Sequence, residues 1–527
     1  MESLEKENPE INDKLEKRKE RIIKWFKDKN NIVFILILLL SLVVIFYYFN
    51  ITKHQTLWYD EAEYMSTANY WAFGIPYQIH QERPPLFPFL AFLLLKLGFN
   101  EVGIRILLEL VPFFLCLIFF YFLVSKMYSK KIALIATFIL SVSWIHIFYT
   151  MRLMTDSIGF LFGILSIYCF WEGYINNKGK IYIWLIGFFV SLSFLVRLTG
   201  VLYGVLILLF LLVTDKFRFL KNKNMWISLL ISLLTILPYL IWSHYYYGNA
   251  FAFRAGYGGG AGSALGWWML TLLYDYPELV FFIFFLVGVL TLLPMFLSLD
   301  IILTKENKKY LSDIFILLNI LFTLAFFIYF LRQGENRWLM MMSIGIFVIS
   351  AKGIVLAYDF INKHIGKILA VIALLLILFS GAYYQLNHAD QIIKGKINTY
   401  DQVREAALWM KQNSDPKDII VSASEPQNTY YSERKTLTHY NSSGHVYFTP
   451  EQFDGIIKEL KPKYYVTSVF EPSIPQWTYS YPDERKFIPV QAWFSDPDKK
   501  QPILVIYEIP SDFILNQSSI KNKSSNN

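Results

Sequence analysis

Long apolar stretches dominate this chain and restrict it to folds that lie mostly within a membrane. A helix needs about 20 predominantly apolar residues to cross a bilayer. The stretches that meet or approach this length are 32–50, 102–125, 131–150, 153–175, 181–196, 199–214, 225–246, 277–299, 311–331, 338–358 and 367–385. Apolar residues make up 55% of the chain and charged residues only 17%, as expected for such a protein. We therefore expect a mainly α-helical, multi-pass membrane protein with these eleven stretches as its spans.

Basic residues indicate the orientation of the spans. The N-terminal segment 1–31 is rich in Lys and Arg, and the other basic loops lie at 126–131, 178–180, 216–223, 305–309 and 363–367. All of them fall on one side, the cytoplasmic side, if residues 84–98 do not cross the membrane. We therefore expect Leu86 to Gly98 to form a short interfacial helix within a first outer loop, 51–101. The net charge of +8 reflects these loops and does not indicate a nucleic-acid partner.

The C-terminal part of the chain changes character after the transmembrane region 32–385. Short β-rich runs occur at 419–421, 464–467 and 503–507, and a helical pattern at 400–412 precedes them. Residues 386–514 are therefore predicted to form an extracytoplasmic, soluble α/β domain. The polar tail, 515–527, is predicted to be disordered.

Acidic residues and arginines gather on the outer side of this topology. They are Asp60, Glu61, Glu63, Glu82 and Arg83 in the first loop, Arg152 and Asp156 at the next outer turn, and Arg197, Arg254, Arg332, Glu335 and Arg337 in later turns. A guanidinium group can neutralise a phosphate, and a carboxylate can deprotonate an attacking hydroxyl. A second carboxylate can orient the first or hold a divalent metal ion. This pattern favours chemistry on a phosphate-bearing lipid at the outer membrane surface.

Several motifs occur in a characteristic order along the chain. They are Asp60-Glu61-x-x-Tyr64, Glu82-Arg83-Pro84-Pro85, Gly98-x-x-x-x-Gly103-x-Arg105, Arg152-x-x-x-Asp156 and Arg337-Trp338-Leu339. This series, spread over residues 30–360, resembles the GT-C glycosyltransferases. Within them it is similar to the branch that holds protein O-mannosyltransferases and the lipid A aminoarabinose transferase.

The resemblance implies a sugar transferase that uses a polyprenyl or dolichyl phosphate carrier as donor and a protein or lipid hydroxyl as acceptor. It implies that Asp60 is the general base and that Asp156 positions the acceptor or the base. Tyr64, Arg83 and Arg337 match positions near the carrier phosphate or sugar, and Glu82 matches a metal-associated position in some members. We add Glu61 to the catalytic candidates, and Arg152 and Arg197 to the phosphate-binding ones, from their place in the outer cluster.

Other interpretations of these residues remain open at this point. The first-loop acids also fit a solvated loop beside aromatic anchors, Asp156 fits a helix start, and Arg197 fits a side chain that reaches lipid headgroups. Glu82 could pair with Arg83 instead of a metal. His54, His80 and His244 lack ligand spacing and fit surface or interfacial positions better than zinc ligands.

Two other functions compete with sugar transfer. A transporter or flippase of lipid-linked sugars would need ionisable residues near mid-membrane or an inverted repeat, and neither is evident. A scaffold that binds a partner through 386–514 would leave the outer charges unexplained. The chain lacks a Rossmann fingerprint and a P-loop, so no nucleotide is expected, and we expect the glycine-rich run 256–262 to be a loop that covers the site.

Overall fold

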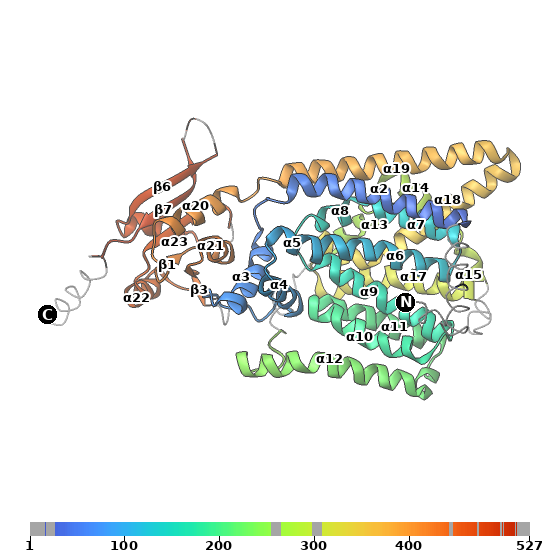
Figure 1. Cartoon of the computed structure of the whole chain (residues 1–527), viewed down its shortest axis with the longest axis horizontal. Helices are drawn as coiled ribbons and strands as arrows, with labels where there is room; N and C mark the ends of the chain where they lie inside the picture. Colours follow the sequence, from blue (N-terminus) through green and yellow to red (C-terminus); the bar gives the residue numbers. More distant parts are fainter. Residues whose placement is uncertain are drawn as a thin grey trace, which may run out of the picture.

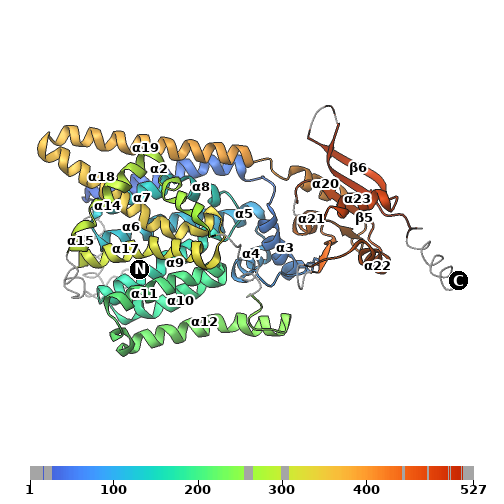
Figure 2. The same cartoon turned by 180° about the vertical axis from the view of Figure 1, so that it is seen from behind.

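The computed structural model describes residues 27–253, 265–297, 308–441, 446–471, 474–495 and 500–511, together with the single residues Glu16, Asp498 and Phe513. Most of the N-terminal segment, the glycine-rich run 256–262 with Arg254, and the tail 515–527 lie outside the described residues. A body of long helices carries a small α/β domain at one end (Figures 1 and 2).

The predicted membrane segments are helical, and the protein is a multi-pass membrane protein. Among the described residues, eight helices are long and apolar enough to span a membrane, and the bent pair α7 and α8 raises this to nine. The long helices are α2 (Lys29–Thr52), α6 (Val111–Met127), α9 (Asp156–Phe170), α12 (Lys223–Tyr247), α14 (Glu278–Leu290), α17 (Lys308–Ala325), α18 (Ser343–His364) and α19 (Lys367–Lys396). Short π-helical or 3-10 segments extend several of them, among them Ile106–Leu110, Trp171–Ile175, Phe326–Leu331 and Asn336–Met342.

Shorter helices complete the membrane body. They are α5 (Glu101–Arg105), α7 (Lys130–Val142), α8 (Trp144–Thr150), α10 (Lys180–Val196), α11 (Val201–Thr214), α13 (Leu272–Asp275) and α15 (Leu293–Leu297), and α7 and α8 meet at a bend of 52°. Two of the eleven predicted spans become α10 and α11, with 17 and 14 residues, and these are not among the eight helices long enough to span.

Small residues allow the central helices to approach closely. A Cβ added to Gly353 of α18 would lie 1.9 Å from the carbonyl oxygen of Phe284 in α14. One added to Gly288 of α14 would lie 2.0 Å from the carbonyl oxygen of Ile349 in α18. Backbone contact of this kind is how membrane helices gain packing energy without a hydrophobic driving force. It fixes the position of α18 and of the segment Asn336–Met342 that leads into it.

The first loop forms two helices between the membrane body and the α/β domain (Figure 1). These are α3 (Tyr59–Phe73) and α4 (Leu86–Lys96). With 11 residues, α4 is too short to cross a bilayer, as the charge distribution predicts. Phe87 and Ala91 of α4 pack with Ala62 and Ala68 of α3 in a single buried cluster. The apolar face of α4 therefore supports the helix that begins with the acidic motif.

The C-terminal part is the predicted α/β domain, built around a five-stranded sheet of order β2-β1-β5-β7-β6. The strands are β1 (Ile419–Val421), β2 (Lys435–Leu437), β5 (Tyr464–Ser468), β6 (Ile488–Phe494) and β7 (Pro502–Glu508), with a separate pair β3 (Tyr440–Asn441) and β4 (Val446–Tyr447). β1 is parallel to β2 and β5, whereas β7 is antiparallel to β5 and β6. The helices are α20 (Asp401–Gln412), α21 (Glu425–Ser432), α22 (Pro450–Leu460) and α23 (Trp477–Glu484).

The domain contacts the first loop directly. The Ser66 hydroxyl of α3 donates to the Pro426 carbonyl of α21 at 3.0 Å, and the Gln427 amide donates to the Leu57 carbonyl at 3.1 Å. The predicted boundary at residue 386 falls within α19, which continues to Lys396. The membrane body and the α/β domain are thus joined both by the short turn 397–400 between α19 and α20 and by packing of α21 on α3.

Candidate active site

The acidic motif begins helix α3, and its local sequence explains why. The Glu61 carboxylate accepts a hydrogen bond from the backbone N–H of Trp58 at 2.6 Å, which satisfies one of the free donors at the helix start. Gly74 ends the helix in the left-handed conformation, with a φ of 74°. Asp60 lies in the first turn, where the helix dipole stabilises negative charge.

Asp60 faces a polar cavity of about 160 Å³. Five of the other predicted site residues line this cavity together with Asp60, namely Tyr64, Glu82, Arg83, Arg197 and Arg337. The lining consists of Asp60, Tyr64, Glu82, Arg83, Pro84, Thr155, Val196, Arg197, Leu198, Thr199, Leu331, Gln333, Arg337 and Trp338. Residues from the first loop, the turns at 155 and 197–199, and the segment before α18 therefore meet at one place.

Two arginines from distant parts of the chain hold the Asp60 carboxylate. The Arg83 Nη2 donates to Asp60 Oδ1 at 2.8 Å, and the Arg337 Nη2 donates to Asp60 Oδ2 at 2.6 Å. Burial by itself would raise the pKa of this carboxyl, but the two guanidinium groups hold its pKa well below the usual value. Asp60 is therefore ionised at neutral pH, as a proton acceptor must be.

Asp156 lies in the first turn of α9 and borders the same arginines. It is buried, its Oδ1 accepts a hydrogen bond from Arg197, and its Oδ2 lies 4.0 Å from the Arg337 Nη1. Asp156 lines a smaller cavity of about 30 Å³, which shares Arg197 and Arg337 with the main one. Arg337 thus connects the two acids that the sequence places almost 100 residues apart.

Tyr64 and Arg83 are two of the first-loop residues that line the cavity. Tyr64 lies one turn after Asp60 and is buried, and the Arg83 guanidinium lies 5.8 Å from the centre of its ring. The Arg83 Nε also contacts Glu63 Oε2 at 2.7 Å. Arg83 is therefore shared between Glu63 and Asp60, with one face against an aromatic ring.

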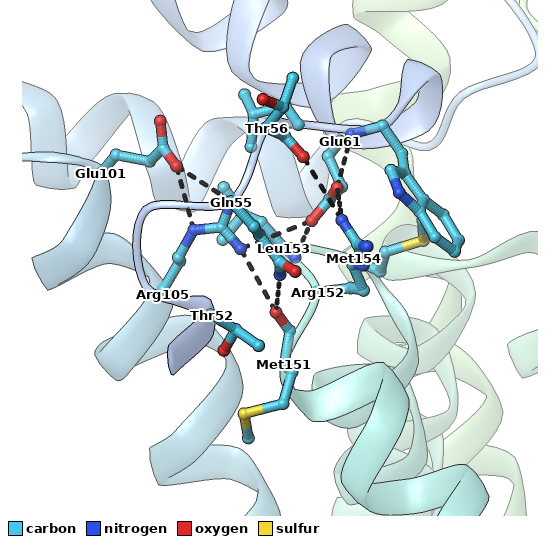
Figure 3. Close-up of polar contacts among 12 residues, drawn as sticks. Thr52, Gln55, Thr56, Glu61, Glu101, Arg105, Met151, Arg152, Leu153 and Met154 are labelled. Carbon is cyan, nitrogen blue, oxygen red and sulfur yellow. Dashed lines mark hydrogen bonds and ion pairs between the residues drawn. The ribbon is translucent and has the colours of Figure 1, made fainter. Parts of the chain in front are cut away.

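Two of the predicted residues, Glu61 and Arg152, line neither of the two cavities. Glu61 is fully buried beside Arg152 and Arg105, and the Arg152 guanidinium lies 3.9 Å from the centre of the Trp58 ring (Figure 3). Arg152 is only 1% exposed and donates to the backbone carbonyls of Thr56 and Lys396. Neither group is placed to touch a molecule in the cavity.

Glu82 belongs to a cluster with Glu63 and His80. One ligand atom from each of the three lies within 4.8 Å of the others, so they can hold a divalent ion. His80 Nδ1 lies 2.5 Å from Glu63 Oε1, and His80 Nε2 lies 3.7 Å from Glu425 Oε2 of α21. Burial by itself would lower the pKa of His80, but Glu63 and Glu425 raise it to about 10. We expected His80 at a surface or interfacial position, but this side chain is only 8% exposed and is buried between Glu63 and Glu425.

An apolar groove of about 420 Å³ adjoins the polar cavity. It is lined by Trp71, Pro85, Leu86, Phe89, Leu195, Thr235, Pro238, Tyr239 and Trp242, from α3, α4, α10 and α12. Pro84 and Val196 line the cavity, and their neighbours Pro85 and Leu195 line the groove. The arrangement has room for a charged headgroup in the cavity and a hydrocarbon chain in the groove.

Comparisons with known proteins agree with this architecture. A family model described as dolichyl-phosphate-mannose-protein mannosyltransferase matches residues 82–242. No curated protein sequence matches the chain. The crystal structure of apo ArnT from Cupriavidus metallidurans superposes with a TM-score of 0.65 at 12% identity, covering 91% of this chain and 98% of that one. The chain has the GT-C fold.

An oligosaccharyltransferase shares the GT-C fold. The enzyme from Archaeoglobus fulgidus, tethered to an acceptor peptide containing the NVT sequon, gives a TM-score of 0.61 at 14% identity, with 93% of this chain and 77% of that one covered. Another structure of ArnT, bound to undecaprenyl phosphate, gives a TM-score of 0.64 at 12% identity over 91% and 98% of the two chains. The resemblance drawn from the first-loop motifs is confirmed.

Glu63 and Glu425 lie beside the cavity residues but were not among the predicted site residues. Glu63 lies one turn after Asp60 in α3, a spacing that places both on neighbouring faces of the helix. Glu425 comes from the α/β domain and reaches the first loop only because α21 packs on α3. The sequence contains no local signal for that contact.

Proposed function

We propose that this protein is a membrane glycosyltransferase that moves a sugar from a polyprenyl or dolichyl phosphate carrier to an acceptor hydroxyl on the outer face. The observation that carries the proposal is Asp60 between two arginines, in a polar cavity that opens beside an apolar groove. Undecaprenyl phosphate bound to ArnT and the family model for a dolichyl-phosphate-mannose-dependent enzyme support this class of donor. In the predicted topology the basic loops lie on the cytoplasmic side and the site residues lie on the other side, which supports a site on the outer face.

The proposed reaction is a single displacement with inversion. The acceptor oxygen attacks the anomeric carbon while its proton passes to Asp60, and the bond between that carbon and the phosphate oxygen breaks. The electron pair of that bond leaves with the carrier phosphate, whose added negative charge is met by Arg83, Arg337 and Arg197. Asp156, which borders both Arg197 and Arg337, orients these cations.

The arginines on Asp60 have a direct consequence for this mechanism. A carboxylate whose pKa is held low is a weak base, and both of its oxygens are engaged before the donor arrives. A phosphate in the cavity would draw Arg83 and Arg337 toward itself and so raise the pKa of Asp60. Donor binding then prepares the base, and the acceptor is expected to react only after the donor is in place.

The decisive test of the proposed function is donor consumption. Purified protein is incubated with a panel of polyprenyl-phosphate sugars, and the lipid products are separated by mass spectrometry. Release of free polyprenyl phosphate from one of them, dependent on an acceptor, is the expected result. If every donor remains intact with protein and lipid acceptors, the proposed function is wrong. A lipid phosphate that co-purifies with the protein would support the same donor class.

The groove predicts a dependence on carrier length. Phe89 lines the groove and is 45% exposed, so Phe89→Ala should fold. Loss of this ring contact is expected to raise the KM for long-chain donors about tenfold, an effect of ~1.4 kcal/mol. The KM for short-chain donors is expected to stay unchanged. Phe73→Ala removes a phenylalanine that is 60% exposed and outside the groove, and serves as the matched control. An equal change with both carrier lengths would contradict a groove for the chain.

We also propose that Glu63, His80 and Glu82 can hold a divalent metal ion beside Arg83. When bound, such an ion would add positive charge near the donor phosphate. His80 is buried, and its Nδ1 lies 2.5 Å from Glu63 Oε1 and 3.9 Å from Glu82 Oε1, an arrangement that fits a ligand position.

Metal binding can be measured without activity. After treatment with EDTA, added Zn²⁺ or Mn²⁺ is expected to raise the Tm of the wild-type protein by a few degrees and to leave His80→Gln unchanged. His244→Gln, which alters an exposed histidine, is the control. Equal metal content in the wild type and His80→Gln would exclude this cluster as the site.

A further inference from the structure

Glu61 follows the proposed base directly, yet its side chain points to a different part of the molecule. Successive helix residues are rotated by about 100° around the axis, so Asp60 and Glu61 cannot face the same cavity. Figure 3 shows Glu61 in a polar network with Arg105, Arg152 and Leu153. Glu61 is fully buried and does not line the cavity. The contacts of this network connect segments that each lead to a cavity residue.

Two backbone N–H groups bind the Glu61 carboxylate. One belongs to Trp58, at the start of α3, and the other belongs to Leu153, in the turn between α8 and α9. Asp60 follows the first of these positions by two residues, and Asp156 follows the second by three. A single carboxylate therefore fixes the spacing between the two segments that present the acids of the site.

Two buried arginines complete the charge balance around Glu61. Arg152 Nη1 lies 3.4 Å from Glu61 Oε2, and Arg105 Nη1 lies 3.5 Å from Glu61 Oε1. Arg105 also pairs with Glu101 at 2.9 Å and donates to the Met151 carbonyl at 3.4 Å. The arginines are 1% and 2% exposed, so loss of the Glu61 charge would leave Arg105 paired with Glu101 alone and Arg152 without a paired carboxylate among the described residues.

The network extends to the α/β domain. Arg152 Nη2 donates to the Lys396 carbonyl at the end of α19, 3.0 Å away. On the other side, the Tyr430 hydroxyl of α21 donates to Glu101 at 3.0 Å. One link between the membrane body and the α/β domain therefore passes through the groups that hold Glu61.

We infer that Glu61 is a positioning residue that holds Asp60 and Asp156 at the distance the transfer reaction needs. It takes no proton and touches neither substrate. This inference rests on the proposed function, because it assigns Glu61 a role in the same site. Small displacements of reacting groups cost large factors in rate, so a residue of this kind acts on kcat more than on donor binding.

The test compares Glu61→Gln with the wild type in three measurements. The variant keeps an acceptor oxygen but loses the charge that balances Arg105 and Arg152. We expect kcat to fall by about 10²-fold, the Kd for undecaprenyl phosphate to change less than threefold, and the acid limb of the pH–rate profile to stay in place. Glu433→Gln, which alters an exposed glutamate paired with Lys411 on the α/β domain, is the matched control.

Hydrogen exchange gives a result that does not depend on activity. Peptides spanning 56–65 and 149–156 are expected to exchange faster in Glu61→Gln, because the Trp58 and Leu153 amides lose a charged acceptor. Should the wild type consume no donor while these peptides still respond, the proposed function fails and the positioning of the two segments stands. Unchanged exchange in both peptides would overturn the inference.

Three kinetic outcomes would also overturn it. They are a wild-type kcat in Glu61→Gln, loss of undecaprenyl phosphate binding, and a displaced acid limb, which would make Glu61 a proton acceptor.

If Glu61→Gln does not fold, Gln55→Ala replaces it. Gln55 donates to the Met151 carbonyl, which Arg105 also contacts, so its loss weakens the same turn without exposing a charge. A smaller fall in kcat with unchanged Kd is expected, and unaltered kcat would overturn the inference.

Discussion

The Asp60→Asn variant is expected to transfer sugar about 10²- to 10⁴-fold more slowly than the wild type, the range for loss of a general base. Asparagine keeps the shape of the side chain and one acceptor oxygen for Arg83 or Arg337, so folding is preserved. Because the variant loses the negative charge that competes with phosphate for these arginines, its affinity for undecaprenyl phosphate is expected to equal or exceed that of the wild type.

Initial rates with the consumed donor, together with a Kd from lipid titration, test this expectation. Asp275→Asn is the matched control, because that carboxylate accepts from the Thr271 hydroxyl and lies outside the cavity. A variant that binds the lipid and transfers sugar at the wild-type rate would exclude Asp60 as the base. One that loses both binding and transfer would point to a binding role for Asp60.

Replacement of Arg337 by glutamine is expected to lower kcat/KM for the donor by about 10²- to 10³-fold, the loss typical of a group that stabilises developing charge. Arg337 is the cation that contacts Asp60 and borders Asp156, so its loss affects both acids. Arg332→Gln is the control, since Arg332 lies in the same segment but is exposed and donates only to the Tyr329 carbonyl among the bonds described.

The same variant has a predicted pH dependence. Arg337 is one of two cations that hold the pKa of Asp60 low, so its removal raises that pKa toward the usual value. A base with a raised pKa becomes protonated at a higher pH, and the acid limb of kcat/KM therefore moves to higher pH in Arg337→Gln. An acid limb at the wild-type position would show that Arg337 does not act on the group that titrates.

The sequence by itself determined the parts of this protein that depend on local composition. Apolar length predicts the membrane helices, and the shortness of the run after Pro85, together with the basic loops, predicts that α4 does not span. The β-rich runs at 419–421, 464–467 and 503–507 are all strands of the sheet, and the helical pattern at 400–412 is α20. These features follow from residue periodicity and from the cost of placing charge in lipid, which are both local properties.

Only the tertiary structure decided which charged residues face the cavity. Asp60 and Glu61 are adjacent acids, yet Asp60 lines the cavity and Glu61 does not. Arg152 and Arg197 are arginines at consecutive outer turns, yet Arg197 lines the cavity and Arg152 is buried against Glu61. His80 and Glu425 are separated by more than 300 residues and approach to 3.7 Å because α21 packs on α3. Helix rotation and domain packing determine these placements, and both are set by contacts between segments distant in the chain, so no local pattern encodes them.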